Sequence, residues 1–347
     1  MKKILYVAST YSHINNFHIP YIDELKKENH VDVLSNGSES TFNINFKKKI
    51  YSLKNIFSIF KIRKILKRNQ YDFIVLNTSL AAFLVRCSLF FYRNRPKVIN
   101  IVHGYLFSEK TNSLKRFFYL KLERTVRKKT DYILTMNQYD FDIAKSKKLS
   151  LNEPIMIPGM GVSRINEDQL ENPYDTSKFN LLFVGELSNR KNQIELINSV
   201  KELKESISNI HLTLLGEGNL KNKFLKIINK ENLSSYVSLK GYIESPANYY
   251  KYCDLYVSSS LQEGLPFNLI HALEFNKNII CSSIKGHIDI ASKTNLVTLY
   301  ENKKDLCEKV IGYHQNKWES NSNEAFEFYS FDRVFQGNLN VIKALID

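Results

Sequence analysis

Hydrophobic and polar positions in the first half of the chain predict strands separated by helices. Short apolar runs, rich in β-branched residues, occupy residues 4–8, 31–34, 73–76, 98–102 and 132–135. Each run suits one buried strand, and the stretches between the runs carry apolar residues at helical spacing. Strands that alternate with helices are typical of βαβ units, so we predict a parallel sheet.

The pattern breaks between residues 155 and 180, around Pro158, Gly159 and Pro173, which predicts a linker. Alternation resumes with apolar runs at residues 181–185, 211–216, 237–241, 254–257 and 278–281, and residues 331–346 resemble a single helix. Each run ends at or just before Gly or Ser, as expected where the chain turns at the carboxyl edge of a sheet. Ligands of open α/β sheets bind at that edge. The sequence therefore predicts an α/β protein with two doubly wound domains joined near residue 162.

Length, composition and charge narrow the picture. A chain of 347 residues suits two cores better than one. It has no run of 18 uncharged apolar residues, and its first apolar run is short for a signal peptide, so we expect a cytoplasmic protein. Its four scattered cysteines lack metal-ligand spacing and are interpreted as reduced thiols.

Residues 1–150 carry a net charge of +17 and the remainder −3. This asymmetry indicates an anionic partner for the first half: a membrane, a phosphate-bearing substrate or nucleic acid.

The segment 258–274 carries the strongest chemical signal. A strand ends in serines, Glu263 and Gly264 form a turn, and Pro266 opens a helix at a position where proline is favoured. Free backbone N–H groups at a helix start, with the positive end of its dipole, suit a diphosphate. Glu263 is placed to accept hydrogen bonds from sugar hydroxyls. The alternative is a plain strand–turn–helix with a surface glutamate.

This segment resembles the donor-site motif of the retaining GT-B glycosyltransferases of family four, and more narrowly the enzymes that assemble capsule and exopolysaccharide repeat units. The resemblance spans the chain and includes the segments 8–21, 102–107, 183–187, 191–193, 214–218 and 285–287. It implies two Rossmann-like domains that face each other across a cleft. Residues 1–162 would form the acceptor and membrane-facing domain, with helix 331–347 packing back on it, and residues 163–330 the domain that binds the nucleotide-sugar.

The resemblance assigns roles to individual residues of the second half. Glu263 matches the glutamate that binds donor-sugar hydroxyls. The second glutamate of the motif, which holds the ribose, is replaced by His271, with Glu274 nearby as a substitute. Lys191 matches the lysine that neutralises the donor diphosphate, and Arg190 is a second cation where the usual earlier arginine is Glu186. The expected donor-binding residues are Gly185, Arg190, Lys191, Gly216, Gly218, Tyr242, Ile243, Glu263, Gly264, Pro266, Phe267, Asn268, Leu269 and His271.

In the first half, His103 matches a histidine that points toward the donor sugar, so we expect it to be catalytic together with Glu263 and Lys191. The glycine-rich first loop of the family is missing, and His13 is the candidate on the acceptor side. Structural roles for each histidine remain the alternative at this stage.

Two segments combine cations with apolar residues at helical spacing. In residues 47–68 the residues Ile50, Leu53, Phe57 and Phe60 form one stripe, and residues 115–129 repeat the composition. Such helices lie on anionic lipid, or the stripe covers the sheet while the cations are solvated.

The sequence thus predicts a metal-independent, retaining transferase at the inner face of the cell membrane, without cofactor. It would move sugar from a nucleotide-sugar, with UDP the favoured nucleotide, to a glycan on a polyprenyl diphosphate. Alternatives are a nucleotide-sugar epimerase on the same fold and a non-catalytic relative. A nucleic-acid-binding protein is disfavoured, because the aromatic residues of the basic half recur at helix-like spacing among apolar neighbours rather than as exposed stacking platforms.

Overall fold

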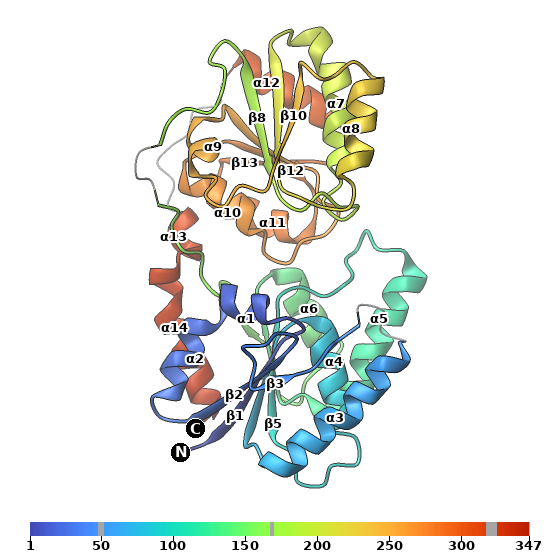
Figure 1. Cartoon of the computed structure of the whole chain (residues 1–347), viewed down its shortest axis with the longest axis vertical. Coiled ribbons are helices and arrows are strands. Elements are labelled where there is room, and N and C mark those ends of the chain that lie inside the picture. Colours follow the sequence, from blue (N-terminus) through green and yellow to red (C-terminus); the bar gives the residue numbers. More distant parts are fainter. Residues whose placement is uncertain (48–51, 167–169, 317–324, 347) are drawn as a thin grey trace. The chain divides into compact units, whose positions relative to one another are not determined.

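A computed structural model describes residues 1–47, 52–166, 170–316 and 325–346 (Figure 1). The chain divides into two compact units. The first comprises Met1–Gly161 together with Phe331–Asp347, and the second comprises Val162–Ser330. The chain crosses between units near residue 162, where the sequence pattern also breaks.

The first unit contains a parallel sheet of seven strands in the order β3-β2-β1-β4-β5-β6-β7. Their bounds are β1 Lys3–Val7, β2 His30–Ser35, β3 Phe42–Asn43, β4 Phe73–Leu76, β5 Lys97–Val102, β6 Tyr132–Thr135 and β7 Ile155–Met156. The helices are α1 Tyr11–Phe17, α2 Ile19–Lys26, α3 Leu53–Asn69, α4 Ser79–Ser88, α5 Ser113–Val126, η1 Arg127–Lys129, α6 Gln138–Ser146 and α14 Phe331–Ile346. Helices on both faces bury the strands, and every residue of β4 is buried.

The second unit contains a parallel sheet of six strands in the order β10-β9-β8-β11-β12-β13. Their bounds are β8 Phe179–Val184, β9 Ile210–Leu215, β10 Val237–Gly241, β11 Leu255–Ser258, β12 Ile279–Ser282 and β13 Val297–Tyr300. The helices are α7 Gln193–Ser206, α8 Lys221–Lys230, α9 Ala247–Tyr252, α10 Phe267–Glu274, α11 Lys285–Ala291, α12 Lys303–Gln315 and α13 Ala325–Tyr329.

The predicted strands form with bounds shifted by at most two residues, and the fold prediction of parallel α/β sheets is confirmed. Three strands were not predicted. β3 and β7 have two residues each and lie at sheet edges, too short for a recognisable pattern, and β7 falls within the predicted linker. β13 is an edge strand of four residues whose two central side chains are only half-buried, which weakens its hydrophobic signal.

Helix α14 returns to the first unit and lies beside α2 (Figure 1). Its residues Leu339 and Ile342 are buried in the same core as Tyr21 of α2. The amide of Asn338 donates hydrogen bonds to the carbonyl of Gly159 at 2.5 Å and to the Tyr21 hydroxyl at 3.2 Å. This buried polar contact fixes the position of the last helix against the end of the first segment.

The apolar stripe predicted within residues 47–68 faces outward on α3. Phe57 and Phe60 are 69% and 65% exposed, and Leu53 is also exposed, whereas α3 buries Asn55, Ser58, Ile62 and Leu66. The sheet-covering alternative is therefore wrong for these residues, because α3 packs against α4 through its opposite side. Ile50, the fourth member of the stripe, lies outside the described residues.

No helix within the described ranges is both long enough and apolar enough to cross a membrane.

Candidate functional site

Glu263 lies at the carboxyl edge of the six-stranded sheet with a cation on each carboxylate oxygen. Its Oε1 lies 2.6 Å from Nζ of Lys191, and its Oε2 accepts a hydrogen bond of 2.8 Å from Nη1 of Arg190. Glu263 is 8% exposed and Lys191 is nearly as buried, while Arg190 is half-exposed. The structure thus brings Glu263 to two cations, Arg190 and Lys191, that precede it by 73 and 72 positions in the chain.

Backbone contacts between two loops fix this arrangement. The N–H of Leu261 donates to the carbonyl of Arg190 at 2.8 Å, and the Ser259 hydroxyl donates to the carbonyl of Asn192 at 2.9 Å. Asn192 adopts a left-handed conformation that starts α7 directly after Lys191. The loop after β8 and the loop after β11 are therefore held side by side, as expected for adjacent parallel strands.

The charge state of Glu263 follows from two opposed effects. Burial raises the pKa of a carboxyl group, but Lys191 and Arg190 together outweigh it and hold the pKa of Glu263 below its usual value. Glu263 is therefore ionised at neutral pH. A buried carboxylate between two cations can accept sugar hydroxyls, and the same cations can bind an anionic ligand.

His287 belongs to this site although the predicted set of site residues omitted it. It is fully buried on α11, its Nδ1–H donates to the carbonyl of Ser282 at 2.7 Å, and its Nε2 has no hydrogen-bond partner among the described residues. Burial lowers the pKa of His287 to about 4, against the opposing effect of Glu263. The signal was present in the sequence, because Lys285-Gly286-His287 follows β12 at the same sheet edge. Gly286 is needed there: a Cβ would lie 2.6 Å from the carbonyl oxygen of Gly264.

His271 lies on α10, and Glu274 holds it in place. His271 Nδ1 is 3.1 Å from Oε2 of Glu274, whose Oε1 accepts the N–H of Ile165 at 2.9 Å. The Glu274 side chain is only 2% exposed. Both oxygens of Glu274 are thus engaged within the protein, and Glu274 orients the imidazole of His271. Its role as a substitute ribose ligand stays a prediction.

The other predicted donor residues near the start of α10 differ in their surroundings. Pro266 precedes the first helical residue, Phe267, and the amide of Asn268 donates to the carbonyl of Val184 at 2.7 Å, which ties α10 to the end of β8. Leu269 does not suit a ligand contact, because its side chain is in the core and its N–H donates to the Pro266 carbonyl.

Gly216 and Gly218 make room for the loop after β8. A Cβ on Gly216 would lie 2.1 Å from the carbonyl oxygen of Gly185, and a Cβ on Gly218 would lie 2.2 Å from that of Leu187. Their contact with a nucleotide stays a prediction. Gly185 in turn leaves space for the Lys191 side chain, since its Cβ would lie 3.3 Å from Cε of that lysine.

Tyr242 and Ile243 follow β10 and differ in burial. Tyr242 is 73% exposed, and Ile243 packs against the core beside α10. An exposed aromatic ring next to the carboxyl edge of the sheet is available to stack on a base.

In the first unit, His103 follows β5, and His13 lies on α1 after β1, which is two strands away in the sheet. Their ring centroids are 4.5 Å apart, and both rings contact His18, which sequence reasoning left without a role. Burial lowers the pKa of His13 to about 4 and that of His103 well below its usual value. All described members of this cluster belong to the first unit, whereas Glu263, Lys191 and Arg190 belong to the second.

Two family models match the chain, one in each half. Residues 3–137 match the glycosyl transferase 4-like model, and residues 165–327 match the model of glycosyl transferases group 1.

Relatives and solved structures agree with the models. The chain is 26% identical to the putative glycosyltransferase EpsD of Bacillus subtilis over 83% of this chain and 81% of EpsD. It is 24% identical to the Escherichia coli UDP-Gal:alpha-D-GlcNAc-diphosphoundecaprenol alpha-1,3-galactosyltransferase, over 74% and 69% of the two chains. The crystal structure of HepE from Anabaena in complex with UDP and glucose superposes with a TM-score of 0.73 at 15% identity, over 99% of this chain and 100% of HepE. The fold and family predictions are confirmed: the chain belongs to the GT-B glycosyltransferases, with a 4-like first half and a group 1 second half.

Proposed function

We propose that this glycosyltransferase moves a sugar from a UDP-sugar to a lipid-linked glycan in capsule or exopolysaccharide assembly. The observation that carries the proposal is the buried Glu263 carboxylate with Lys191 and Arg190 on its two oxygens. A single site that offers both an acceptor for hydroxyls and two donors for phosphates suits a sugar joined to a diphosphate.

In the proposed reaction, Lys191 and Arg190 stabilise the negative charge that develops on the leaving diphosphate. Glu263 binds hydroxyls of the sugar and His271 binds the ribose, and the family resemblance assigns His103 a contact with the donor sugar. Lys191 and Glu263 are already paired, so little reorganisation is needed when the donor binds. The family resemblance supports retention of configuration and no metal at the chemical step.

The choice of donor and acceptor rests on the relatives. UDP is bound in the HepE structure, and the Escherichia coli relative is named for UDP-Gal and a diphosphoundecaprenol-linked sugar. The exposed Tyr242 beside the sheet edge suits stacking on uracil.

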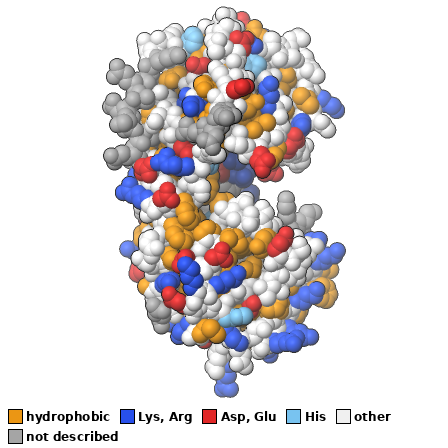
Figure 2. Space-filling model, turned by 60° about the vertical axis from the view of Figure 1, so that its left-hand side comes forward, with side chains coloured by type: hydrophobic (Ala, Val, Ile, Leu, Met, Phe, Trp, Pro, Cys, Tyr) orange, Lys and Arg blue, Asp and Glu red, His pale blue; other side chains and the backbone are white. Residues whose placement is uncertain are grey.

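The lipid-linked acceptor places the enzyme at the inner face of the cell membrane, and surface features of the first unit support this. Hydrophobic side chains are exposed on α3 and α5, namely Leu53, Ile56, Phe57, Phe60, Leu114, Phe117 and Phe118. Figure 2 shows Lys and Arg side chains along the margin of this unit with hydrophobic side chains between them. Cations interspersed with exposed apolar groups are the composition of interfacial helices.

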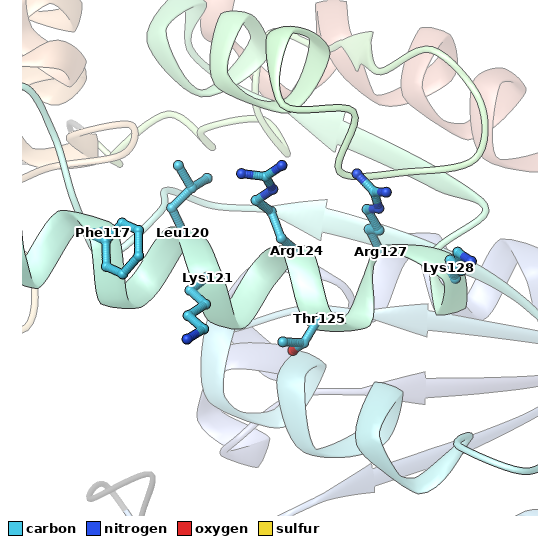
Figure 3. Close-up of a pocket in the computed structure, with 7 residues that line it drawn as sticks. All are labelled: Phe117, Leu120, Lys121, Arg124, Thr125, Arg127 and Lys128. Atoms are coloured by element: carbon cyan, nitrogen blue, oxygen red, sulfur yellow. The ribbon is translucent and has the colours of Figure 1, made fainter.

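A shallow pocket along α5 has the same composition. It has a volume of about 510 Å³ and is lined by Phe117, Leu120, Lys121, Arg124, Thr125, Arg127 and Lys128. Figure 3 shows Leu120, Arg124 and Arg127 pointing to one side of α5. These guanidinium groups suit the phosphates of anionic lipid.

Calorimetry with UDP and with UDP-, GDP- and ADP-sugars tests the proposal. Lys191→Ala should weaken binding of the UDP-sugar by about 10- to 100-fold, because a charge-assisted hydrogen bond contributes roughly 1.5–3 kcal/mol. Lys223→Ala, an exposed lysine on α8, is the matched control and should bind like the wild type. Equal affinities for the two variants would refute the role of Lys191.

The same titrations test the ribose contact. His271→Ala should raise the dissociation constant about two- to tenfold, the effect of one neutral hydrogen bond. Donor consumption without acceptor would favour the epimerase alternative, and undetectable donor binding by the wild type would favour the non-catalytic one.

A further inference from the structure

Three histidines that are distant in the sequence meet in the first unit. His13 lies on α1, His18 lies between α1 and α2, and His103 follows β5. One nitrogen from each ring lies within 4.8 Å of those of the other two. We propose that this cluster binds a divalent transition metal ion, with Zn²⁺ as the best fit, and leaves one coordination position open.

The distances between ring nitrogens suit tetrahedral zinc. Nε2 of His18 and Nε2 of His103 are 3.2 Å apart and form a hydrogen bond in which either ring can donate, and a bound ion would replace this bond. Two ligands at the usual zinc–nitrogen distance of about 2.0–2.1 Å lie roughly 3.3 Å from each other in a tetrahedral site. This pair therefore already has the spacing of two zinc ligands. His13 is half-buried, and a change of its side-chain rotamer would be needed to bring the third nitrogen to the same distance.

Unpaired nitrogen atoms point to a missing ligand. Nε2 of His13 and Nδ1 of His18 are buried and have no hydrogen-bond partner among the residues described. His18 is itself completely buried. Buried polar atoms in proteins nearly always have a partner, so such atoms within one cluster need an explanation. A metal ion supplies a partner for Nε2 of His13. It does not supply one for Nδ1 of His18, because the nitrogen of that ring that faces the cluster is Nε2.

The groups around the three histidine rings suit a bound metal ion. Within the part of the chain that the structure describes, no carboxylate takes part in the cluster; the ring contacts around it come from Tyr6 and Phe17. Three imidazoles form a ligand set that zinc prefers, and the fourth position remains for a water or an oxygen atom of a ligand.

Metal binding would also affect transfer. If His103 contacts the donor sugar, which rests on the proposed function, zinc held by its Nε2 removes that contact. Zinc should then slow transfer reversibly, and the metal-free protein is the active form. Metal binding itself does not depend on this step.

The experiment uses the full chain, freed of any histidine tag and treated with a chelator. Cobalt serves as a spectroscopic probe, because imidazole-bound tetrahedral Co²⁺ absorbs in the visible range, and zinc is then titrated by competition. Wild type should bind one ion per chain. His13→Gln should weaken binding about 100-fold or more, since even the loss of a group that only orients a ligand costs about 10- to 100-fold.

His30→Gln is the matched control, because His30 lies on β2 of the same unit with an exposed side chain and is not part of the cluster. It should bind cobalt like the wild type, and far-ultraviolet circular dichroism should show all three proteins folded. A wild type without visible cobalt bands, or equal affinities for His13→Gln and His30→Gln, overturns the proposal. Intact cobalt binding with no effect of zinc on transfer keeps the metal site and refutes only the role of His103 in transfer.

Discussion

At the scale of single residues, burial acts in opposite ways on two titratable groups of the second unit. It raises the pKa of Glu263 and lowers that of His287. For Glu263, Lys191 and Arg190 reverse the effect, whereas for His287 the attraction of Glu263 is too weak to do so. The outcome is an ionised carboxylate beside a neutral imidazole, which is a defined charge state for ligand binding.

His287 should make the stability of the protein depend on pH. The unfolded state binds a proton at a pKa near 6.5, whereas the folded state does so only at about 4. The folded state therefore binds fewer protons between these values, and stability falls as the pH drops from about 6.5 to about 4. The loss attributable to this group is roughly 3 kcal/mol. In urea unfolding across this range, His287→Asn should show a shallower loss of stability than the wild type. Equal slopes would contradict the assignment.

At the scale of elements, the loops at the carboxyl edge of the six-stranded sheet pack backbone to backbone. The N–H of Gly216 donates to the carbonyl of Gly241 at 2.7 Å, and that of Leu187 donates to the carbonyl of Glu217 at 2.9 Å. Gly216 also has φ of +136°, a conformation that residues with a Cβ rarely adopt. The loop after β9 therefore supports the loop that carries Arg190 and Lys191.

Gly216→Ala should destabilise the protein by about 1–3 kcal/mol, because the methyl group meets the Gly185 carbonyl and the backbone is strained. Gly312→Ala is the matched control: Gly312 lies on α12 with open space around its Cβ position, and should gain about 0.5–1 kcal/mol. Thermal unfolding compares the two. Similar melting temperatures for both variants would show that the loop contact is unimportant.

At the scale of the whole molecule, positive charge and exposed apolar side chains occur on the same unit. The first 150 residues carry a net charge of +17 and include α3 and α5. The structure distinguishes the cations that are structural. Arg63 donates to the carbonyls of Ser88 and Phe90, so it holds the end of α4 and is unsuitable for a test of membrane binding.

Replacement of Lys61, Lys64, Lys67 and Arg68 by Gln should weaken sedimentation with anionic lipid vesicles by about 100-fold or more at low salt, since each cation near the surface contributes about 1 kcal/mol. Phe57→Ser with Phe60→Ser should weaken it independently of salt. The matched control replaces Lys223, Lys226, Lys230 and Lys240, which are exposed on the second unit. Equal losses for both charge variants, or a wild type that does not sediment, would exclude the proposed surface.

The sequence by itself determined the two parallel α/β halves and the location of the donor-site candidates. Buried parallel strands are continuous apolar runs, and turns at their carboxyl ends leave local marks, as in the segment from Glu263 to Pro266. These features depend on neighbours in the chain. Local pattern therefore predicted the sheet-edge positions of Glu263 and Lys191, and the family resemblance assigned both to one donor site.

Only the tertiary structure decided which residues meet. The pairing of Glu263 with Lys191, the contact of Glu274 with the N–H of Ile165, and the cluster of His13, His18 and His103 all depend on contacts within each unit between segments that the fold brings together. The outward direction of the α3 stripe also depends on which side of the helix α4 covers. Helical spacing shows which residues share one face of a helix, but it does not show which element packs against that face. Packing partners follow from the order of the strands in the sheet and not from the local pattern, and this is the physical reason why the sequence alone could not predict these contacts.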